Sequence, residues 1–315
     1  MLIRFVVILL FLSFIAIDGF GQYYDKTRAW KKTRHELVGG IGVGNYLGEL
    51  GGGSGEKRPW LMDMEWSQMK FSWGLGYRYN MSYRFASRLN FAWVKVGGSD
   101  QLTSNPQRQY RNLSFKSNIY EFSFLVDYYI FRAKPGHLYN IKGARGMKGM
   151  PFDVIAFVGV GGFYFKSKSD GIALAKLGTE GQGLEGGSKP YSPYSVSFPF
   201  GLSFNYVYYQ NIKFGLDFSY RFTLTDYIDD ASTVYYDNDK LRGAKGDLSA
   251  DMADKSDGSN PGWTSAGSPR GNPKNKDHFL SIMVTATYNI SSLIKKTSRP
   301  GGKHSFNKKR KRARF

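Results

Sequence analysis

The chain has 315 residues, no cysteine and a formal net charge of +19. The missing cysteines exclude disulfides, thiolate metal sites, a cysteine nucleophile and lipidation at a cysteine. Aromatic residues make up 17% of the chain while its mean hydropathy is −0.41, which disfavours a helical membrane bundle and suits strands with one apolar face.

The first segment, residues 1–21, has the three parts of a secretory signal peptide. Arg4 supplies the positive start, residues 5–17 are apolar, and Gly19 and Gly21 are the small residues before a cleavage site. A transmembrane anchor is the alternative, but the apolar stretch is shorter than the ~20 residues that a spanning helix needs. We therefore expect an exported chain whose residues 22–36 form a periplasmic N-terminal segment.

Eight segments after residue 36 alternate apolar and polar residues, as strands with two different faces do. In the clearest of them, Phe214, Leu216 and Phe218 share one face while Lys213 and Asp217 share the other. The segment 152–166 is apolar on both faces, so its register stays open. The eight segments are 37–48, 73–81, 88–97, 119–130, 152–166, 195–208, 212–222 and 280–290.

The apolar faces of these segments favour a membrane barrel over a soluble β-sandwich, which would also alternate. They are long enough to cross a bilayer at a tilt, which takes ~9–11 residues, and they carry aromatic residues near their ends, where girdles lie. We predict an all-β fold, an eight-stranded antiparallel transmembrane β-barrel over residues 37–290, in the outer membrane of a Gram-negative cell.

The connections between the predicted strands differ in length on the two sides of the membrane. With the first strand leaving the periplasm, the extracellular connections are 50–66, 98–114, 167–190 and 225–276. The periplasmic connections are 82–87, 131–151 and 209–212. Long loops outside and short turns inside are typical of outer-membrane barrels, and the long 131–151 connection departs from that pattern.

The excess positive charge falls on the periplasmic side of this topology. By count of Lys and Arg against Asp and Glu, residues 22–36, 131–151 and 291–315 carry +3, +5 and +10, whereas the four extracellular connections together carry −2. Such a face suits docking to an acidic periplasmic protein surface. The alternative is a disordered, solvated basic tail over 291–315, and the export signal contradicts nucleic-acid binding. The residues expected to contact a partner are Arg132, Lys142, Arg145, Lys148, Lys295, Lys296, Lys308, Lys309, Arg310, Lys311, Arg312 and Arg314.

Charged residues on the inward face of the strands have a structural explanation. An eight-stranded barrel is just wide enough for side chains to fill, and charges that are buried there must pair. We therefore expect an internal network of ion pairs instead of a pore. Its expected members are Arg78, Glu121, Asp127, Asp217 and Arg221.

The sequence offers little support for catalysis. Barrel enzymes that process lipids use a serine with a histidine near the membrane rim, and His278 lies near Ser281. A polar strand end explains these two residues more simply. We predict no catalytic site and no small-molecule substrate.

Metal and cofactor sites are also disfavoured. Four acidic residues of the last extracellular connection could bind calcium through their oxygens, but their spacing lacks an EF-hand pattern. The glycine-rich stretch 159–162 falls inside a strand pattern with no helix after it, so it is not a nucleotide loop. We predict no metal site and no cofactor. The acidic residues are Asp229, Asp230, Asp237 and Asp239.

Seven stretches of the chain carry a family resemblance. They are 44–49, 76–80, 112–121, 159–164, 177–183, 220–230 and 270–272. Together they resemble the PorG family of outer-membrane barrels from gliding and type IX-secreting bacteria, in order over about 36–290. The loop stretches 179–183 and 225–230 are the more specific ones, because glycine–tyrosine pieces are common in barrels.

This resemblance implies an outer-membrane component of the secretion or gliding apparatus that anchors a periplasmic ring, built from a lipoprotein and its partner, and that has no enzymatic site. The chain departs from the family in the 131–151 connection and in the tail after 290, both on the side where a ring would dock. Two other functions stay open: a stand-alone OmpA/OmpX-like barrel for surface binding or envelope stability, and a barrel enzyme acting on envelope lipids.

Overall fold

The computed structural model describes residues 26–48, 50, 66–133, 151–209 and 211–291. The predicted signal peptide, most of the 50–66 and 131–151 connections and the basic tail from 292 onward lie outside the described residues.

The described residues form nine strands and a few short helices. The strands are β1 (His35–Leu47), β2 (Lys70–Asn80), β3 (Phe85–Ser99), β4 (Ser114–Phe131), β5 (Phe152–Ser169), β6 (Ile172–Ala173), β7 (Tyr194–Tyr209), β8 (Ile212–Thr223) and β9 (His278–Asn289). The α-helices are α2 (Pro106–Arg111), α3 (Asn238–Lys245) and α4 (Asp247–Ala253). Short 3-10 helices are η2 (Lys26–Thr33), η4 (Trp66–Gln68), η5 (Asp100–Leu102), η6 (Leu174–Lys176) and η7 (Pro261–Trp263). Within the described ranges, none of these helices is long and apolar enough to span a bilayer.

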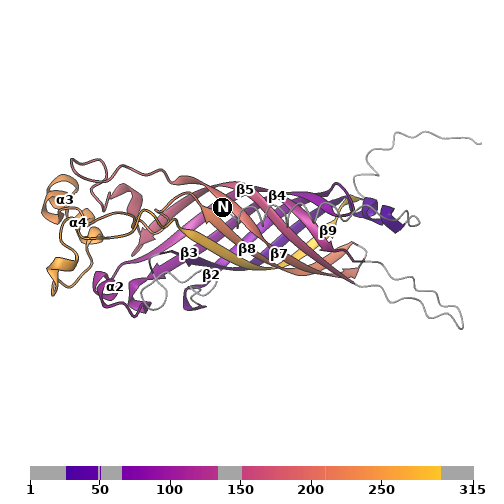
Figure 1. The fold of residues 1–315 in the computed structure, drawn as a ribbon, viewed down its shortest axis with the longest axis horizontal. Helices are drawn as coiled ribbons and strands as arrows, with labels where there is room; N and C mark the ends of the chain where they lie inside the picture. The colour runs from indigo at the N-terminus through magenta and orange to yellow at the C-terminus, as the bar shows by residue number, and fades with distance from the viewer. Residues whose placement is uncertain (1–25, 49, 51–65, 134–150, 210, 292–315) are drawn as a thin grey trace, which may run out of the picture.

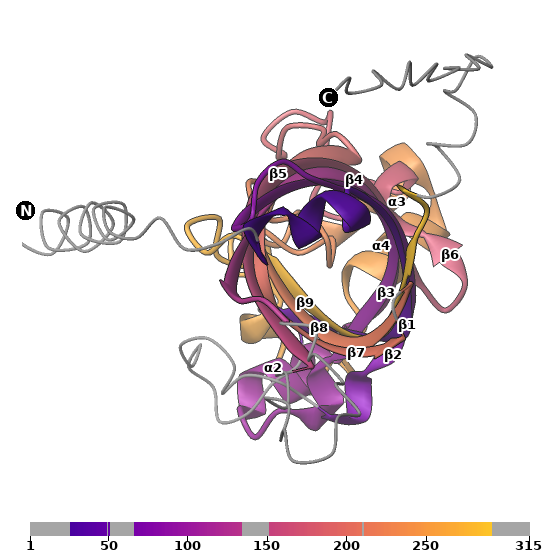
Figure 2. The same cartoon turned by 90° about the vertical axis from the view of Figure 1, so that its right-hand side faces the viewer.

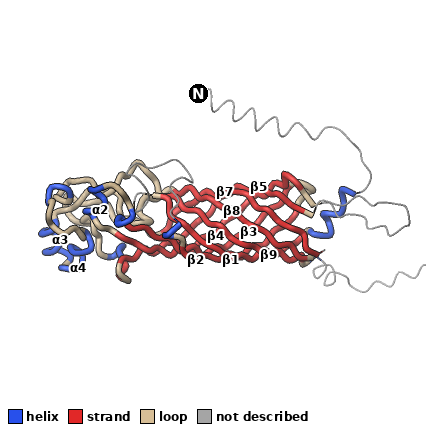
Figure 3. The backbone as a smooth tube through the Cα atoms, turned by 90° about the horizontal axis from the view of Figure 1, so that it is seen from below, coloured by secondary structure: helices blue, strands red, loops and turns tan. Residues whose placement is uncertain are grey.

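Eight of the strands close into a barrel. Each strand pairs antiparallel with the next, and β1 pairs with both β2 and β9, which closes the cylinder. The two-residue strand β6 pairs only with the end of β5. Figures 1 and 3 show the strands running obliquely around the long axis, and Figure 2 looks down that axis. The predicted eight-stranded antiparallel β-barrel is confirmed.

The alternation along each strand sorts its side chains into an outer and an inner face. On β8 the predicted outer residues Phe214, Leu216 and Phe218 are exposed, while Lys213 and Asp217 are buried inside. The other strands follow the same rule, so the outside of the barrel is apolar and much of the inside is polar. This is the reverse of a soluble sandwich, whose apolar faces point inward.

The structure gives the register of β5, which the sequence leaves open. Val158 and Val160 face outward, whereas Phe157, Phe163 and Phe165 are buried inside the barrel. Phe163 and Phe165 belong to an apolar cluster at one end of the interior, which explains why both faces of this strand are apolar.

Several strands are longer than the sequence pattern predicts. β4 begins at Ser114 instead of 119, and β5 ends at Ser169 instead of 166, so that each has 18 residues. At ~3.3 Å per residue such a strand spans ~60 Å, about twice the hydrocarbon thickness of a bilayer. β1 begins at His35 instead of 37, which moves Glu36 from the predicted N-terminal segment into the barrel.

The two ends of the barrel differ. At one, which we call the short-turn end, four residues separate β2 from β3 and two separate β7 from β8. The two ends of the described chain also meet there, with the His35 amide donating to Ser291 Oγ at 2.8 Å. At the other end the connections 100–113, 170–193 and 224–277 carry α2, α3 and α4 and fold together (Figure 1). We call these three connections the loop dome.

Candidate functional site

The outer wall of the barrel carries a continuous apolar belt. Phe122 on β4 is 59% exposed and Val284 on β9 is equally open, although both lie in the middle of regular strands. Exposed apolar surface on this scale is unusual on a water-soluble monomer and marks a surface that contacts other apolar material. A barrel whose outer face alternates in this way is built to contact hydrocarbon.

A row of aromatic side chains borders the belt on the side of the loop dome. These residues are direct register partners across five neighbouring strands, so they lie side by side around the wall. The ring centroids of Tyr120 and Tyr164 are 6.3 Å apart, and those of Tyr164 and Tyr194 are 5.1 Å apart. This outer girdle consists of Trp73, Trp93, Tyr120, Tyr164 and Tyr194.

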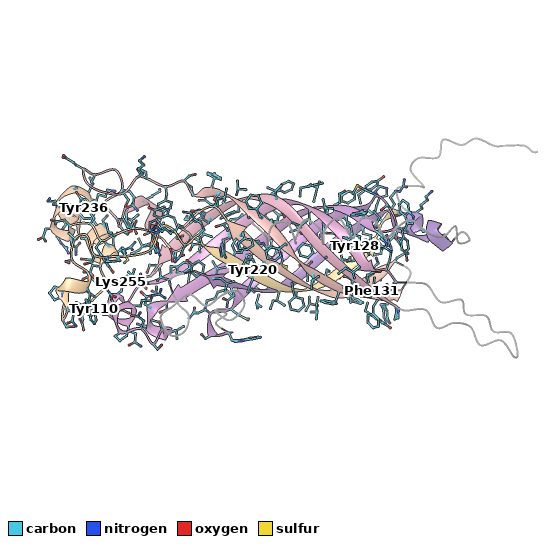
Figure 4. The ribbon with its side chains drawn as sticks, viewed as in Figure 1. Tyr110, Tyr128, Phe131, Tyr220, Tyr236 and Lys255 are labelled. Atoms are coloured by element: carbon cyan, nitrogen blue, oxygen red, sulfur yellow. The ribbon has the colours of Figure 1, made fainter. Side chains whose placement is uncertain are left out.

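A second aromatic set borders the belt at the short-turn end. Phe85 packs on Tyr128 with centroids 5.2 Å apart, and Phe152 packs on Tyr206 at 5.4 Å. Figure 4 shows Tyr128 at this end of the barrel, far from the loop dome. From the outer girdle to this set the chain advances eight residues on β4 and twelve on β5, or ~26–40 Å, which a tilt of ~40° reduces to ~20–30 Å, around the ~25 Å apolar band of a membrane barrel.

A chain of ion pairs fills the barrel interior near the short-turn end. Lys213 Nζ lies 2.8 Å from Glu36 Oε1 and 2.9 Å from Asp153 Oδ2. Arg78 continues the chain, with Nη1 at 3.4 Å from Glu36 Oε2 and Nε at 2.6 Å from Asp127 Oδ2. All five side chains are buried, so the contacts compensate charges that water cannot reach.

Arg88 extends this chain toward the middle of the barrel. Its guanidinium lies 3.3 Å from Asp127 Oδ1 and 3.2 Å from Asp217 Oδ2. Arg221 and Glu121 form a separate pair, with Nε and Oε2 2.8 Å apart. A cavity of about 30 Å³ borders Arg88, Asp217 and Arg221, enough for about one water molecule. The described side chains therefore fill this part of the interior and leave no aqueous lumen there.

The five residues predicted to form interior ion pairs all lie inside the barrel. The structure brings Arg78 to Asp127 and Glu121 to Arg221, and it pairs Asp217 with Arg88, which is not among the five predicted residues. Three further members were missed for particular reasons. Glu36 falls in the segment predicted to precede the barrel, Asp153 lies in the strand of open register, and the sequence predicts an inward Lys213 without indicating its partner.

The loop dome seals the other end of the barrel with an apolar cluster. Ile228 of the 224–277 connection is fully buried against the inward-facing residues Phe163, Phe165 and Phe279. Its carbonyl oxygen accepts a 2.6 Å hydrogen bond from Ser167 Oγ. A loop residue is thus inserted into the barrel mouth, and side chains close the barrel at the loop end as well.

A buried polar network holds the dome together. The carboxylate of Glu180 accepts from the amide of Ser232 at 2.8 Å, from Thr233 Oγ1 at 2.6 Å and from Arg270 Nη1 at 3.2 Å. Thr179 Oγ1 donates to Asp230 Oδ2 at 2.7 Å. The loop stretches 179–183, 225–230 and 270–272, which carried the family resemblance, therefore meet in one network, and their residue types are explained by the contacts within the dome.

Two acidic groups of the dome hold their protons more tightly than usual. Burial raises the pKa of Asp230 to about 6, although Arg270 acts in the opposite direction. Burial and the neighbouring Asp229 raise the pKa of Asp277 well above its ordinary value. The hydroxyl of Tyr46 contacts both Asp229, at 2.7 Å, and Asp277. One hydroxyl has one proton, so both contacts are hydrogen bonds only when one carboxyl is protonated.

The short-turn end carries the attachment points of the basic segments. η2 lies across the barrel mouth in the axial view (Figure 2). Arg132 is half-buried, with Nη1 donating to the Tyr83 carbonyl at 2.6 Å and the guanidinium 4.1 Å from the centre of the Tyr129 ring. Its contacts lie within the chain. The other residues predicted to contact a partner are outside the described ranges, namely Lys142, Arg145, Lys148, Lys295, Lys296, Lys308, Lys309, Arg310, Lys311, Arg312 and Arg314.

The residues considered for catalysis do not come together. His278 lies against Phe222 on the outer wall, with ring centroids 4.8 Å apart. Ser281, three positions along β9, points inside and accepts a 2.8 Å hydrogen bond from Arg221. Residues an odd number of positions apart on a strand face opposite sides, so this histidine cannot activate this serine.

The four aspartates considered for calcium are also dispersed. Asp229 and Asp230 are buried in the dome, whereas Asp237 caps α3 by accepting from the Lys240 amide at 3.1 Å and Asp239 lies exposed in the first turn of that helix. Over the part of the chain that the structure describes, no group of three His, Cys, Asp or Glu side chains could hold a metal ion. Gly159, Gly161 and Gly162 lie within β5, as the strand pattern predicts.

Comparison with known proteins finds one matching family and several similar barrel structures. A family described as "Domain of unknown function (DUF6089)" matches residues 27–145. No curated protein matches the sequence.

Among solved structures, the chain is similar to Ail of Yersinia pestis, with 10% identity, a TM-score of 0.34 and coverage of 81% of this chain and 97% of that one. Neisserial surface protein A is 7% identical, with a TM-score of 0.38 and coverage of 81% of this chain and 96% of that one. The outer membrane protein OprG of Pseudomonas aeruginosa is 10% identical, with a TM-score of 0.37 and the same two coverages. The fold assignment rests on the strand pairings of this chain itself.

Proposed function

We propose that this protein is a non-enzymatic outer-membrane barrel that anchors a periplasmic assembly at its short-turn end. In the specific form that the PorG resemblance implies, the assembly is the periplasmic ring of the type IX secretion or gliding machinery, made of a lipoprotein and its partner. The apolar belt with its two aromatic borders supports placement in a membrane. The filled interior argues against a pore, so the protein would act through its ends.

The observation that carries the anchoring role is the position of the basic segments. Residues 131 and 152, which flank the 131–151 connection, lie at the short-turn end, and His35 contacts Ser291 there. The segments 22–36, 131–151 and 291–315, with charges of +3, +5 and +10, are therefore all joined to the barrel at one end. Two chain ends and short turns on one side are the periplasmic arrangement of outer-membrane barrels.

Charge of one sign gathered at one end favours a partner of opposite charge. Basic segments would steer an acidic periplasmic protein surface to the barrel and orient it, with an effect that salt weakens. The loop dome, whose three connections together carry −3, offers no such attraction.

The test is recovery of partners from solubilised envelopes. One variant lacks residues 295–315, a second replaces Lys142, Arg145 and Lys148 with Gln, and a matched control replaces the dome residues Lys189, Lys240 and Lys274 with Gln. We expect the first two to lose periplasmic partners and protein secretion while the control keeps both. Unchanged partner recovery with both basic variants would overturn the anchoring role.

A second function is favoured by one feature of the dome. A pocket of about 430 Å³ opens between Pro190, Tyr191, Tyr227 and Pro273, and the rings of Tyr191 and Tyr227 stack with centroids 4.2 Å apart. A stand-alone surface-binding barrel would use such a pocket. Preserved secretion together with lost surface binding in a deletion strain would select this function over the anchor.

A further inference from the structure

The outward-facing charges of the barrel wall are all positive and lie in one place. The acidic residues of the described strands are Glu36, Glu121, Asp127, Asp153 and Asp217, and every one of them is buried inside the barrel. By the alternation of β3, β4 and β5, the side chains of Lys95, Lys116, Lys166 and Lys168 point outward instead. We call these four residues the wall lysines.

Strand register brings the wall lysines together on three neighbouring strands. Lys116 on β4 pairs directly with Lys168 on β5, and Asn118 pairs with Lys95 on one side and with Lys166 on the other. On neighbouring strands, direct partners have their Cβ atoms ~5 Å apart and diagonal ones ~7–8 Å. Lys95 and Lys166 are two strands, or ~10 Å, apart, so the long side chains of all four positions can converge on one doubly charged group. Like charges placed opposite each other repel, and a bound anion would relieve that repulsion.

The acidic side chains that the structure describes close to these lysines are engaged elsewhere. Asp170, two residues beyond Lys168, pairs with Lys255 at 2.5 Å, and Asp100, beyond the end of β3, is buried against Arg111 at 2.7 Å. Among the described residues, none of the four wall lysines forms an ion pair. Figure 4 places Lys255 where the barrel meets the dome, which is the level that β5 reaches at its end.

The level of the patch on the wall indicates what would bind there. Lys95 follows Trp93 of the outer girdle by two residues, and Lys166 and Lys168 follow Tyr164 by two and four. These steps along a strand tilted by ~40° place the lysine Cα atoms ~5–10 Å beyond the girdle. The polar headgroup layer of a bilayer is ~5–7 Å thick on each side, so the wall lysines lie at the depth of lipid phosphates.

We propose that the wall lysines form a binding site for the headgroup of a lipid that carries two phosphate groups, in the leaflet on the loop-dome side. Four cations within reach of one another match a bisphosphorylated headgroup better than a phospholipid, whose single phosphodiester charge would leave most of them uncompensated. The outer leaflet of a Gram-negative outer membrane contains glycolipids of this kind. The inference rests on the membrane placement and orientation of the proposed function and is independent of the anchoring role.

The test uses the full mature chain in phosphatidylcholine nanodiscs. Native mass spectrometry measures binding of diphosphoryl lipid A, monophosphoryl lipid A, phosphatidylglycerol and free pyrophosphate. We expect diphosphoryl lipid A to bind about tenfold more tightly than the other three, with an affinity that falls as salt is raised. If phosphatidylglycerol binds as tightly as diphosphoryl lipid A, the preference for a bisphosphorylated headgroup is overturned. If free pyrophosphate binds as tightly, the assignment of a lipid ligand is overturned.

Three variants test the residues themselves. Replacing all four wall lysines with Gln should weaken binding of diphosphoryl lipid A by at least about tenfold. Replacing them with Arg should keep it. A control of equal charge change, in which the exposed dome residues Lys176, Lys189, Lys240 and Lys274 become Gln, should bind as the unmodified protein does.

The site is overturned if the wall Gln variant binds normally or if the dome control loses as much affinity. The shift of barrel mobility on gels after heating verifies that each variant is folded. Because no periplasmic partner is present in this assay, its outcome is separate from that of the envelope experiment above.

Discussion

The pair between Glu121 and Arg221 allows a quantitative test of the filled interior. Glu121 is fully buried, Arg221 is 3% exposed, and their contact is 2.8 Å long. Among the described residues, neither forms a second ion pair. Glu121→Gln preserves the shape of the side chain but leaves a buried guanidinium without an anion. Removing one partner of a buried pair costs about 3–5 kcal/mol, so we expect a loss of that size in the free energy of unfolding.

A matched variant in the other ion-pair chain should cost much less. Asp217→Asn removes one anion from Arg88, but Arg88 keeps Asp127 at 3.3 Å, and the Asp217 side chain is 11% exposed. We expect a loss of about 1 kcal/mol, the net value of an ordinary hydrogen bond. Combining Glu121→Gln with Arg221→Met removes both buried charges and should recover at least about 2 kcal/mol relative to Glu121→Gln alone.

Urea unfolding in lipid vesicles, followed by tryptophan fluorescence, measures all three variants against the unmodified chain. The reasoning is refuted if Glu121→Gln is no more destabilising than Asp217→Asn. It is refuted equally if the double variant is as unstable as Glu121→Gln alone, since removing the unpaired guanidinium would then recover nothing.

Three further predictions address the wall and the dome. Phe124→Arg in the middle of the belt should cost about 2–4 kcal/mol in the same unfolding assay, whereas Leu102→Arg in the exposed dome should cost nothing, and equal losses would contradict the belt. The pKa of Asp230 is raised to about 6 in the folded state, so its contribution to dome stability is complete below about pH 4 and is lost as the pH rises through 6. Hydrogen exchange of the dome amides should therefore speed up over that range, once corrected for intrinsic rates, and Asp230→Asn should flatten the change; an unchanged pH profile would exclude this role. Gly181 has a φ of +68° and a Cβ there would lie 2.5 Å from the Tyr236 ring, so Gly181→Val should expose the dome to limited proteolysis without unfolding the barrel, and intact resistance would count against the packing described.

The fold could be predicted from the sequence because each strand carries its own period-two pattern. Residues such as Phe214 and Lys213 reveal their faces from their immediate neighbours alone. The pattern failed where it is locally absent. β5 is apolar on both faces because Phe163 and Phe165 pack under the dome. The extensions of β4 and β5 beyond the hydrocarbon layer no longer alternate apolar with polar residues.

The contacts of the site depend on partners far apart in the chain, which no local pattern reveals. Glu180 and Arg270 meet across 90 residues, and Arg88 and Asp217 across 129. The outward lysines were visible in the sequence, but only the register of β3, β4 and β5 brings them together. A count of charges by connection assigns the positive excess to the periplasmic side and does not detect a basic patch on the opposite rim.

The central claim is that one face of each strand contacts hydrocarbon while the other fills a closed interior. The chain contains no cysteine, so single cysteines can be placed along 120–130 of β4 and spin-labelled in lipid bilayers. At the neighbouring positions Phe124, which is 47% exposed, and Leu125, which is 2% exposed, the account predicts opposite behaviour. Labels at even positions should be reached by oxygen dissolved in the lipid, and labels at odd positions by neither oxygen nor a water-soluble relaxation agent. Equal access of the water-soluble agent to both faces would contradict the account.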